Sequence, residues 1–278
     1  MTKDHETDQG TGKRTSIERV LGILDLFTEE RPAWTVDMMM LELGQSRATT
    51  YRYVKVLADS GLLAPAAGGS YVLGSRFIQI DRQIRRTDPL LRVATPILAQ
   101  EQAPVIGAKI ISSFYGTQVL SIHVEQSDHL ITLLMERGRT FPLLFGAPSR
   151  IILAYLPSYQ LRNVYTSNRD EIARIGLGDS WEAFRAAIKK IRNAGYYVST
   201  GMLDHSTMGV AAPIFHAPGV VSASLCYVRR RAICTAEDTL ELTRLVTQTA
   251  RQISGQLQQF TPEDGQPSTA FPTPRVAG

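Results

Sequence analysis

One short stretch of the chain combines basic and small polar side chains without any acidic ones. Between Leu43 and Ala58 the sequence has three basic residues and no Asp or Glu. Guanidinium and ammonium groups bind phosphate, arginine also pairs with guanine, and threonine contacts base edges or the thymine methyl group. The stretch is therefore a candidate surface for double-stranded DNA. The predicted contacts are Ser46, Arg47, Ala48, Thr49, Tyr51, Arg52 and Lys55.

The same stretch has the periodicity of a helix that begins after Ser46, a good N-cap residue, and ends at Gly61. At about 3.6 residues per turn, apolar and polar residues fall on opposite faces. Arg47 then lies in the first turn, where recognition helices reach base edges. Arg52 and Lys55 lie further along and suit phosphate contacts. The predicted core face contains Thr50, Val54, Leu57 and Ala58.

An ordinary solvated helix is the alternative interpretation of such a charged face. It does not account for the missing acids, because residues 1–100 hold 13 Lys and Arg against 12 Asp and Glu. The whole chain has a formal net charge of only +4, so a DNA-binding surface must be local. The predicted elements around the helix also favour the DNA interpretation.

Two shorter helices are predicted to precede this one. Helical spacing of apolar residues begins at Ser16 and continues through Phe27, until Pro32 ends it. A second helix is predicted for VDMMMLEL, capped by Thr35 and broken by Gly44.

A hairpin is predicted to follow, because short apolar runs at 62–65 and 71–73 flank a glycine turn. Three short helices and a hairpin are typical of a winged helix-turn-helix, which we expect over residues 15–75. The hairpin tip adds predicted DNA contacts at Gly68, Gly69 and Ser70.

A second domain is predicted for residues 93–260, after a linker helix at 76–92 that Pro89 should break. Helices are expected from Pro148, after Ser180 and from Thr235. This mixture of elements predicts an α+β fold with helices packed on a largely antiparallel sheet. Strands are predicted at 105–112, 118–124, 130–135, 196–198, 210–215 and 220–228.

The two ends of the chain, residues 1–14 and 261–278, are polar and lack periodicity, so we expect loose tails. No run of eighteen apolar residues indicates a membrane span, and the N-terminus has no apolar core of a secretory signal. Sparse cysteine usage, with only Cys226 and Cys234, is typical of a reducing cytoplasm.

Catalytic and metal-binding patterns are weak. The tripeptide Asp204-His205-Ser206 has the residue types of a hydrolase triad, but adjacent side chains point in different directions and cannot form the relay alone. The sequence has no GxSxG elbow, HExxH helix, P-loop or dinucleotide-binding glycine motif. His123 and His129 have no nearby cysteine or third ligand. We therefore predict no enzyme, no metal site and no cofactor.

Segments from both predicted domains resemble the IclR family of transcription regulators over about residues 15–260. The N-terminal segments are SIERVLGILDLF, LELGQSRATTYRYVKVLADSGLL and YVLGSRFIQI. The later segments are FPLLFGAPSRIILAYLP, NAGYYVSTGMLDHSTMGVAAPIF and VSASLCYVRRRAICT. No one motif is specific by itself, whereas their ordered set is.

The resemblance implies a winged-helix domain followed by an effector-binding domain of GAF-like α/β fold. It also implies a homo-oligomer, either a dimer or a tetramer, that binds palindromic operators in double-stranded DNA. Effectors of the family are small organic acids or aromatic catabolites, and its members either repress or activate transcription.

The predicted effector site departs from the family pattern. Family members that bind small carboxylates use backbone N–H groups at the start of a helix that corresponds to Ala147 and Pro148 here, and proline has no N–H to donate. Several positions that are polar in other family members carry less polar residues here, while the residues expected to form the walls of the site stay apolar. By this resemblance the effector site contains Leu130, Leu133, Phe141, Ala147, Pro148, Ser199, Thr207, Gly209, Cys226 and Val228.

Two interpretations of this less polar site remain open. One is a larger, more hydrophobic effector, such as an aromatic or alicyclic acid, whose carboxylate Arg150 would bind unless that side chain points to solvent. The other is a domain that has lost ligand binding and serves assembly or contacts with a partner protein.

Overall fold

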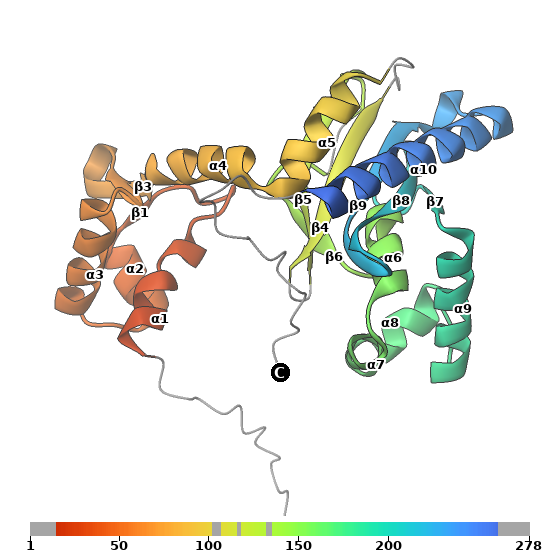
Figure 1. The fold of residues 1–278 in the computed structure, drawn as a ribbon. Helices are drawn as coiled ribbons and strands as arrows, with labels where there is room; N and C mark the ends of the chain where they lie inside the picture. Colours follow the sequence, from red (N-terminus) through yellow and green to blue (C-terminus); the bar gives the residue numbers. More distant parts are fainter. Residues whose placement is uncertain (1–14, 102–106, 116–117, 132–134, 261–278) are drawn as a thin grey trace, which may run out of the picture. The chain divides into compact units, whose positions relative to one another are not determined.

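The computed structural model describes residues 15–101, 107–115, 118–131 and 135–260. The predicted tails 1–14 and 261–278 and the predicted site residue Leu133 lie outside these residues. The chain divides into two compact units, with the boundary between Arg86 and Thr87 (Figure 1).

The first unit contains the helices α1 (Ser16–Leu21), α2 (Val36–Leu43) and α3 (Arg47–Asp59). The first predicted helix was too long, because α1 ends at Leu21 and only a 3-10 turn, Leu24–Leu26, follows. Gly22 and Ile23 join the two segments as a turn with right-handed helical backbone angles, and Ile23 lies in the core with no exposed surface. Apolar spacing through Phe27 thus reflects packing of two segments rather than one continuous helix.

Strands β2 (Leu63–Pro65) and β3 (Ser70–Leu73) form the predicted antiparallel hairpin. Its turn needs Gly68 and Gly69, whose φ angles of 70° and 71° favour glycine. A third strand that the sequence did not indicate, β1 (Trp34–Thr35), pairs with β3. The core beneath these strands contains Ile23, Trp34, Met39, Tyr53, Val54, Leu57 and Leu63.

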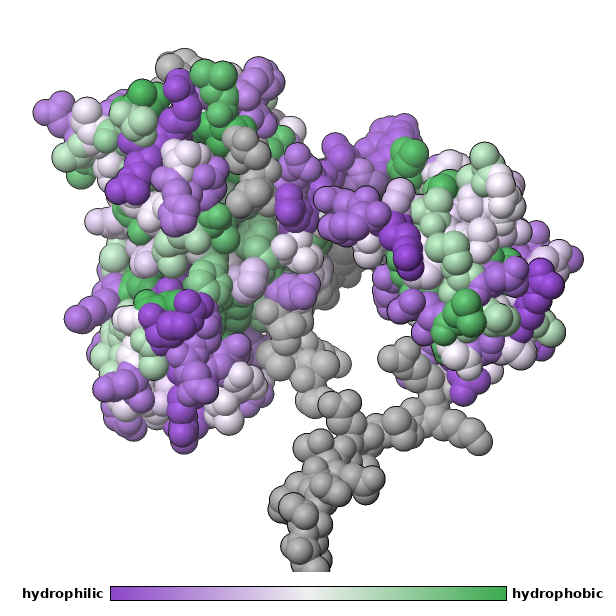
Figure 2. All heavy atoms as spheres, turned by 180° about the vertical axis from the view of Figure 1, so that it is seen from behind, coloured by the Kyte–Doolittle hydropathy of each residue, from purple (hydrophilic) through white to green (hydrophobic). Residues whose placement is uncertain are grey.

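Helix α4 (Arg76–Thr87) and helix α5 (Pro89–Ala99) are separated at Asp88, the N-cap of α5, as Pro89 predicted. The predicted linker 76–92 therefore extends past the unit boundary into α5, which packs against α10 (Ala236–Gln259). Helix α4, which leads up to the unit boundary, buries no residue, and its surface is largely hydrophilic in Figure 2.

The second unit is built on one antiparallel sheet with the strand order β6-β5-β4-β9-β8-β7. Consecutive strands pair as hairpins, β4 with β5 and β8 with β9, and β4 also pairs with β9 to join the two halves. This architecture confirms the predicted α+β fold. The strands are β4 (Ala108–Tyr115), β5 (Gln118–Gln126), β6 (Thr140–Pro142), β7 (Tyr197–Thr200), β8 (Thr207–Ala217) and β9 (Val220–Arg230).

Helices cover both faces of this sheet (Figure 1). Helices α5 and α10 pack on one face, where residues such as Leu225 and Tyr227 of β9 point. The alternate residues Cys226 and Val228 point to the other face, which α6 covers. The helices associated with this second face are α6 (Gly146–Tyr155), α7 (Ser158–Ser167), α8 (Arg169–Arg174) and α9 (Trp181–Ala194).

The predicted strand at 130–135 is wrong where the structure describes it. Leu130 lies in a turn and Ile131 in a bend. The Asp128 carboxylate fixes this turn by accepting a hydrogen bond from the Leu130 N–H at 3.0 Å and forming an ion pair with Arg230 at 2.7 Å. A tertiary ion pair, which sequence periodicity does not report, thus overrides the local β propensity of the segment.

Candidate functional site

Helix α3 presents a polar surface at its first turns. Ser46 caps the helix, because its hydroxyl accepts a hydrogen bond from the Thr49 N–H at 3.3 Å. Thr50, Val54 and Leu57 are buried, as the periodicity predicts. The predicted contacts Arg47, Ala48, Tyr51, Arg52 and Lys55 are exposed, and Thr49 is half-buried.

A surface hollow brings the first turns of α3 together with the hairpin tip. It is lined by Arg47, Ala48 and Tyr51 from α3 and by Gly68 and Gly69 from the tip. Two residue sets that lie apart in the sequence, and that were predicted separately, thus share one surface.

One acidic side chain in this hollow was missed by the sequence analysis. Asp37, in the first turn of α2, pairs with the Arg47 guanidinium at 2.9 Å. Both side chains are well exposed, 60% for Asp37 and 74% for Arg47, so water and salt weaken the pair. In the sequence, the only signal for this contact is that Asp37 and Arg47 lie in the first turns of two consecutive helices, α2 and α3.

Four predicted effector-site residues converge between α6 and the sheet. A Cβ atom placed on Gly209 of β8 would lie 3.3 Å from Cys226 Sγ and 3.4 Å from Ser199 Oγ. The same position is 3.8 Å from the Cβ of Ala147 in α6. The space beside Gly209 is therefore too small for a methyl group unless a neighbouring side chain shifts. Full burial holds the pKa of the Cys226 thiol well above its usual range, so this side chain stays neutral.

The other predicted residues lie around or away from this cluster. Val228 pairs with Gly209 in the sheet register, and Thr207 begins β8. Pro148 is buried in the first turn of α6. Leu130 was expected in the apolar wall, but it is 76% exposed, because the turn at Asp128 directs it outward.

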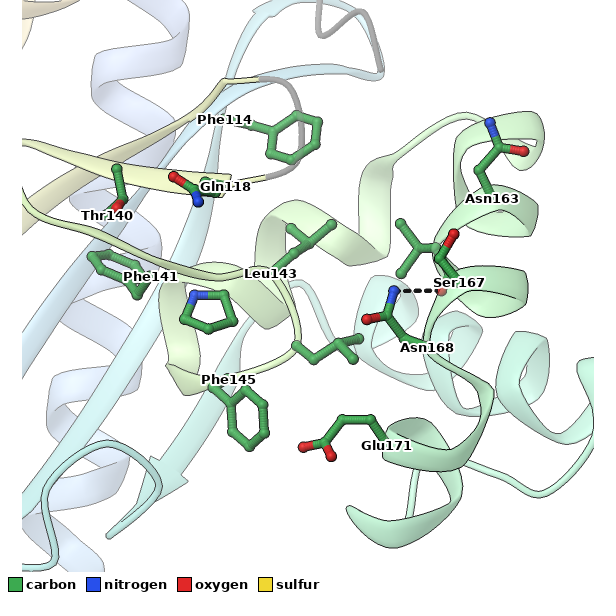
Figure 3. Close-up of a pocket in the computed structure, with 13 residues that line it drawn as sticks. Phe114, Gln118, Thr140, Phe141, Leu143, Phe145, Asn163, Ser167, Asn168 and Glu171 are labelled. Atoms are coloured by element: carbon green, nitrogen blue, oxygen red, sulfur yellow. Dashed lines mark hydrogen bonds between the residues drawn. The ribbon is translucent and has the colours of Figure 1, made fainter. Parts of the chain in front are cut away.

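Phe141 lines a separate cavity of about 380 Å³ near the β6 edge of the sheet (Figure 3). Phe114 and Phe145 add aromatic surface, while α7 and α8 contribute the polar side chains on the opposite wall. The Glu171 carboxylate at this wall is held by the Arg174 guanidinium. This cavity was not predicted from the sequence, because neither α7 nor α8 was predicted.

Arg150 lies inside the domain and does not point to solvent. Its side chain is among the largest fully buried ones, with 2% of the residue exposed. The guanidinium carbon is 5.8 Å from the ring centroid of Tyr197 on β7. Burial lowers the pKa of Arg150, because the charged form loses its hydration.

The Asp204-His205-Ser206 segment forms a turn rather than a triad. The Asp204 carboxylate accepts hydrogen bonds from the Ser206 N–H at 2.8 Å and its hydroxyl at 2.9 Å. In the part of the chain that the structure describes, no group of His, Cys, Asp and Glu side chains could hold a metal ion. No helix among the same residues has the length and hydropathy needed to cross a bilayer.

A winged helix-turn-helix unit joined to an α/β ligand-binding unit defines a class of transcription regulators. Comparisons with known proteins identify the family within this class. Residues 16–66 match the IclR helix-turn-helix domain, and residues 89–255 match the C-terminal domain of bacterial IclR transcriptional regulators. The chain therefore belongs to the IclR family of transcriptional regulators and is not an enzyme.

Individual relatives are distant in sequence but similar in extent and fold. The transcriptional regulator KipR of Bacillus subtilis is 25% identical over 87% of this chain and 96% of its own length. The Pca regulon regulatory protein of Pseudomonas putida is 26% identical over 76% of this chain and 72% of its own. Among solved structures, an IclR homologue from Microbacterium hydrocarbonoxydans in complex with 4-hydroxybenzoate has a TM-score of 0.72. It is 21% identical and covers 88% of this chain and 100% of that one.

Proposed function

We propose that this regulator binds a palindromic operator as a dimer or a tetramer, with α3 of each DNA-bound protomer in a major groove. The observation that carries this proposal is the exposed basic part of α3 from Arg47 to Lys55, which contains no acidic residue and shares one surface hollow with the hairpin tip. Two such helices would lie about one turn of DNA apart, or a multiple of it.

Different residues of α3 have different roles in this proposal. Arg47, at the first turn, reaches base edges, whereas Lys55 lies further along the helix and contacts phosphate. Arg47 must leave Asp37 to do so, and an exposed ion pair of this kind costs at most about 1 kcal/mol to break.

A binding assay with DNA from the protein's own promoter region tests this assignment. We expect Arg47→Ala to weaken binding to the matched operator far more than to a scrambled one, and Lys55→Ala to weaken both alike. Lys190→Ala, which removes the same charge from an exposed position of α9, is the matched control. Equal losses for Arg47→Ala on matched and scrambled DNA would contradict the division of roles.

We further propose that the second unit binds a relatively hydrophobic or aromatic organic acid, which changes the placement of the two DNA-binding units. The apolar surroundings of Gly209 support this proposal, as does the 4-hydroxybenzoate complex of the Microbacterium homologue. The effector acts only if its affinity differs between the two arrangements.

One observation favours the alternative of a domain kept for assembly alone. The space at Gly209 is too small even for a methyl group unless a neighbouring side chain shifts, so an effector requires the surrounding segments to move apart. Thermal unfolding with a panel of aromatic and alicyclic acids separates the two, because a ligand that favours the native state raises the melting temperature. If no acid in the panel has this effect, the assembly role stands.

A further inference from the structure

Arg150 is a buried cation without the partners that buried cations normally have. It lies on α6 with 2% of its surface exposed, and neither its Nε nor its Nη1 atom has a hydrogen-bond partner among the described residues. Most buried polar groups in proteins are hydrogen-bonded, and each exception calls for an explanation.

The charge of this guanidinium is not neutralised by an acidic residue of the described chain. Within residues 15–101, 107–115, 118–131 and 135–260, no Asp or Glu lies within ion-pair distance of Arg150. The internal segments outside those ranges, 102–106, 116–117 and 132–134, contain no acidic residue in their sequence. An unpaired charge inside a protein lowers its stability, so this position favours a negative group from outside the described residues.

The place of Arg150 connects it with the predicted effector site. Ala147, one helical turn earlier on α6, lies against the Gly209 cluster, and residues three apart share a helix face. Tyr197, beside the guanidinium, is on β7 two residues before Ser199. Arg150 therefore borders the cluster on the side of β7.

The β7–β8 connection covers this region. The Tyr197 hydroxyl donates a hydrogen bond to Met202 Sδ at 3.9 Å. A Cβ atom placed on Gly146 would lie 2.7 Å from Leu203 Cδ1, so Leu203 packs directly on the start of α6. These two side chains give an apolar surface next to the buried cation.

We propose that the Arg150 guanidinium binds the carboxylate of the effector, in place of the backbone N–H that Pro148 cannot donate. This inference rests on the proposed effector function and specifies its ligand class, a monocarboxylate with an apolar or aromatic body. The carboxylate supplies both the negative charge and the oxygen acceptors that the Arg150 N–H groups lack. The apolar body displaces Met202 and Leu203.

The test compares acids with their uncharged amides on the full-length protein. The probes are benzoate, 4-hydroxybenzoate and cyclohexanecarboxylate, each with its carboxamide at matched ionic strength, and melting temperatures and affinities are measured. The variants are Arg150→Met, which removes the charge, and Arg150→Lys, which keeps it. The control is Arg192→Met, because Arg192 donates from Nε to the Ala154 carbonyl at 2.6 Å and is already satisfied.

We expect at least one acid to bind the wild type and to lose roughly 30-fold or more in affinity in Arg150→Met, as for other truncated buried charge pairs. Arg150→Lys keeps part of the affinity, and Arg192→Met keeps all of it. Without ligand, Arg150→Met melts at or above the wild-type temperature, because an unpaired buried charge has been removed.

The results that would overturn the role of Arg150 differ from those that would overturn the effector function. If an acid binds wild type and Arg150→Met equally, or if acid and amide bind equally well, the effector function stands and the role of Arg150 is overturned. If neither acids nor amides bind the wild type, both proposals fail together.

Discussion

Replacing Asp37 by asparagine should strengthen DNA binding while it weakens the fold. Asp37 pairs with Arg47 at 2.9 Å inside the hollow that we assign to DNA, so it competes with the DNA for this guanidinium. Its side chain is 60% exposed, and pairs this exposed contribute at most about 1 kcal/mol. Release of Arg47 should therefore raise DNA affinity by up to about five-fold.

Two further quantities distinguish competition from other effects. Because Asp37→Asn removes one negative charge from the surface that faces the DNA phosphates, the slope of log affinity against log salt should become steeper by up to about 0.9. Asp37 also lies in the first turn of α2, where a negative charge stabilises the helix, so unfolding free energy should fall by about 0.3–1 kcal/mol.

Fluorescence anisotropy with labelled operator at several salt concentrations measures the DNA affinity and its salt dependence, and urea unfolding measures the stability. Glu42→Gln is the matched control, since Glu42 is an exposed acid near the end of the same helix. Weaker operator binding by Asp37→Asn, at unchanged salt dependence, would refute the reasoning. Asp37 would then orient Arg47 for DNA rather than compete with it.

Three other perturbations follow from the structure. Ser46→Ala removes the cap of α3 and should lower the unfolding free energy, measured by urea titration, by about 0.5–2 kcal/mol. Operator binding should weaken as well. An unchanged stability would contradict the capping role. Gly209→Ala places a methyl group 3.3 Å from Cys226 Sγ and should cost about 1–3 kcal/mol of stability and reduce the thermal response to acids. A Cys226→Ala background should relieve this cost, and if it does not, the contact is not its source. Asp128→Asn should flatten the acid side of the plot of unfolding free energy against pH. The Arg230 guanidinium holds the pKa of Asp128 below its usual 3.8 in the folded protein. The stabilisation by this ion pair is therefore complete above pH 3.8 and disappears as the pH falls through the lower pKa of the folded state. An unchanged acid limb in pH-dependent urea unfolding would argue against this pair.

The parts of the fold that depend on local chemistry were predictable from the sequence. Ser46, Ser180 and Thr235 each cap the helix expected after them, and Gly44 adopts the left-handed conformation that ends α2. Caps act over a few residues, so their signal is contained in the sequence window that is read.

The features that were predicted wrongly or not at all depend on contacts between residues that are far apart in the sequence. The turn at Leu130 depends on Arg230, which lies 102 positions from Asp128. The 380 Å³ cavity depends on α7 and α8, which pack across from β6. The proposed DNA-binding surface was predicted from the acid-free stretch of α3, but Asp37 of the neighbouring helix also lies in the same hollow. Periodicity reports which face of an element is buried and not which element covers it.

The burial of Cys226 leaves the wild-type chain with a convenient reporter. The sequence has only two cysteines, and the Cys226 thiol is both fully buried and held neutral. Cys234, just before α10, is partly exposed. A maleimide fluorophore should therefore label the native protein at this one position without any mutation, and its emission would follow effector titrations in the unmodified sequence.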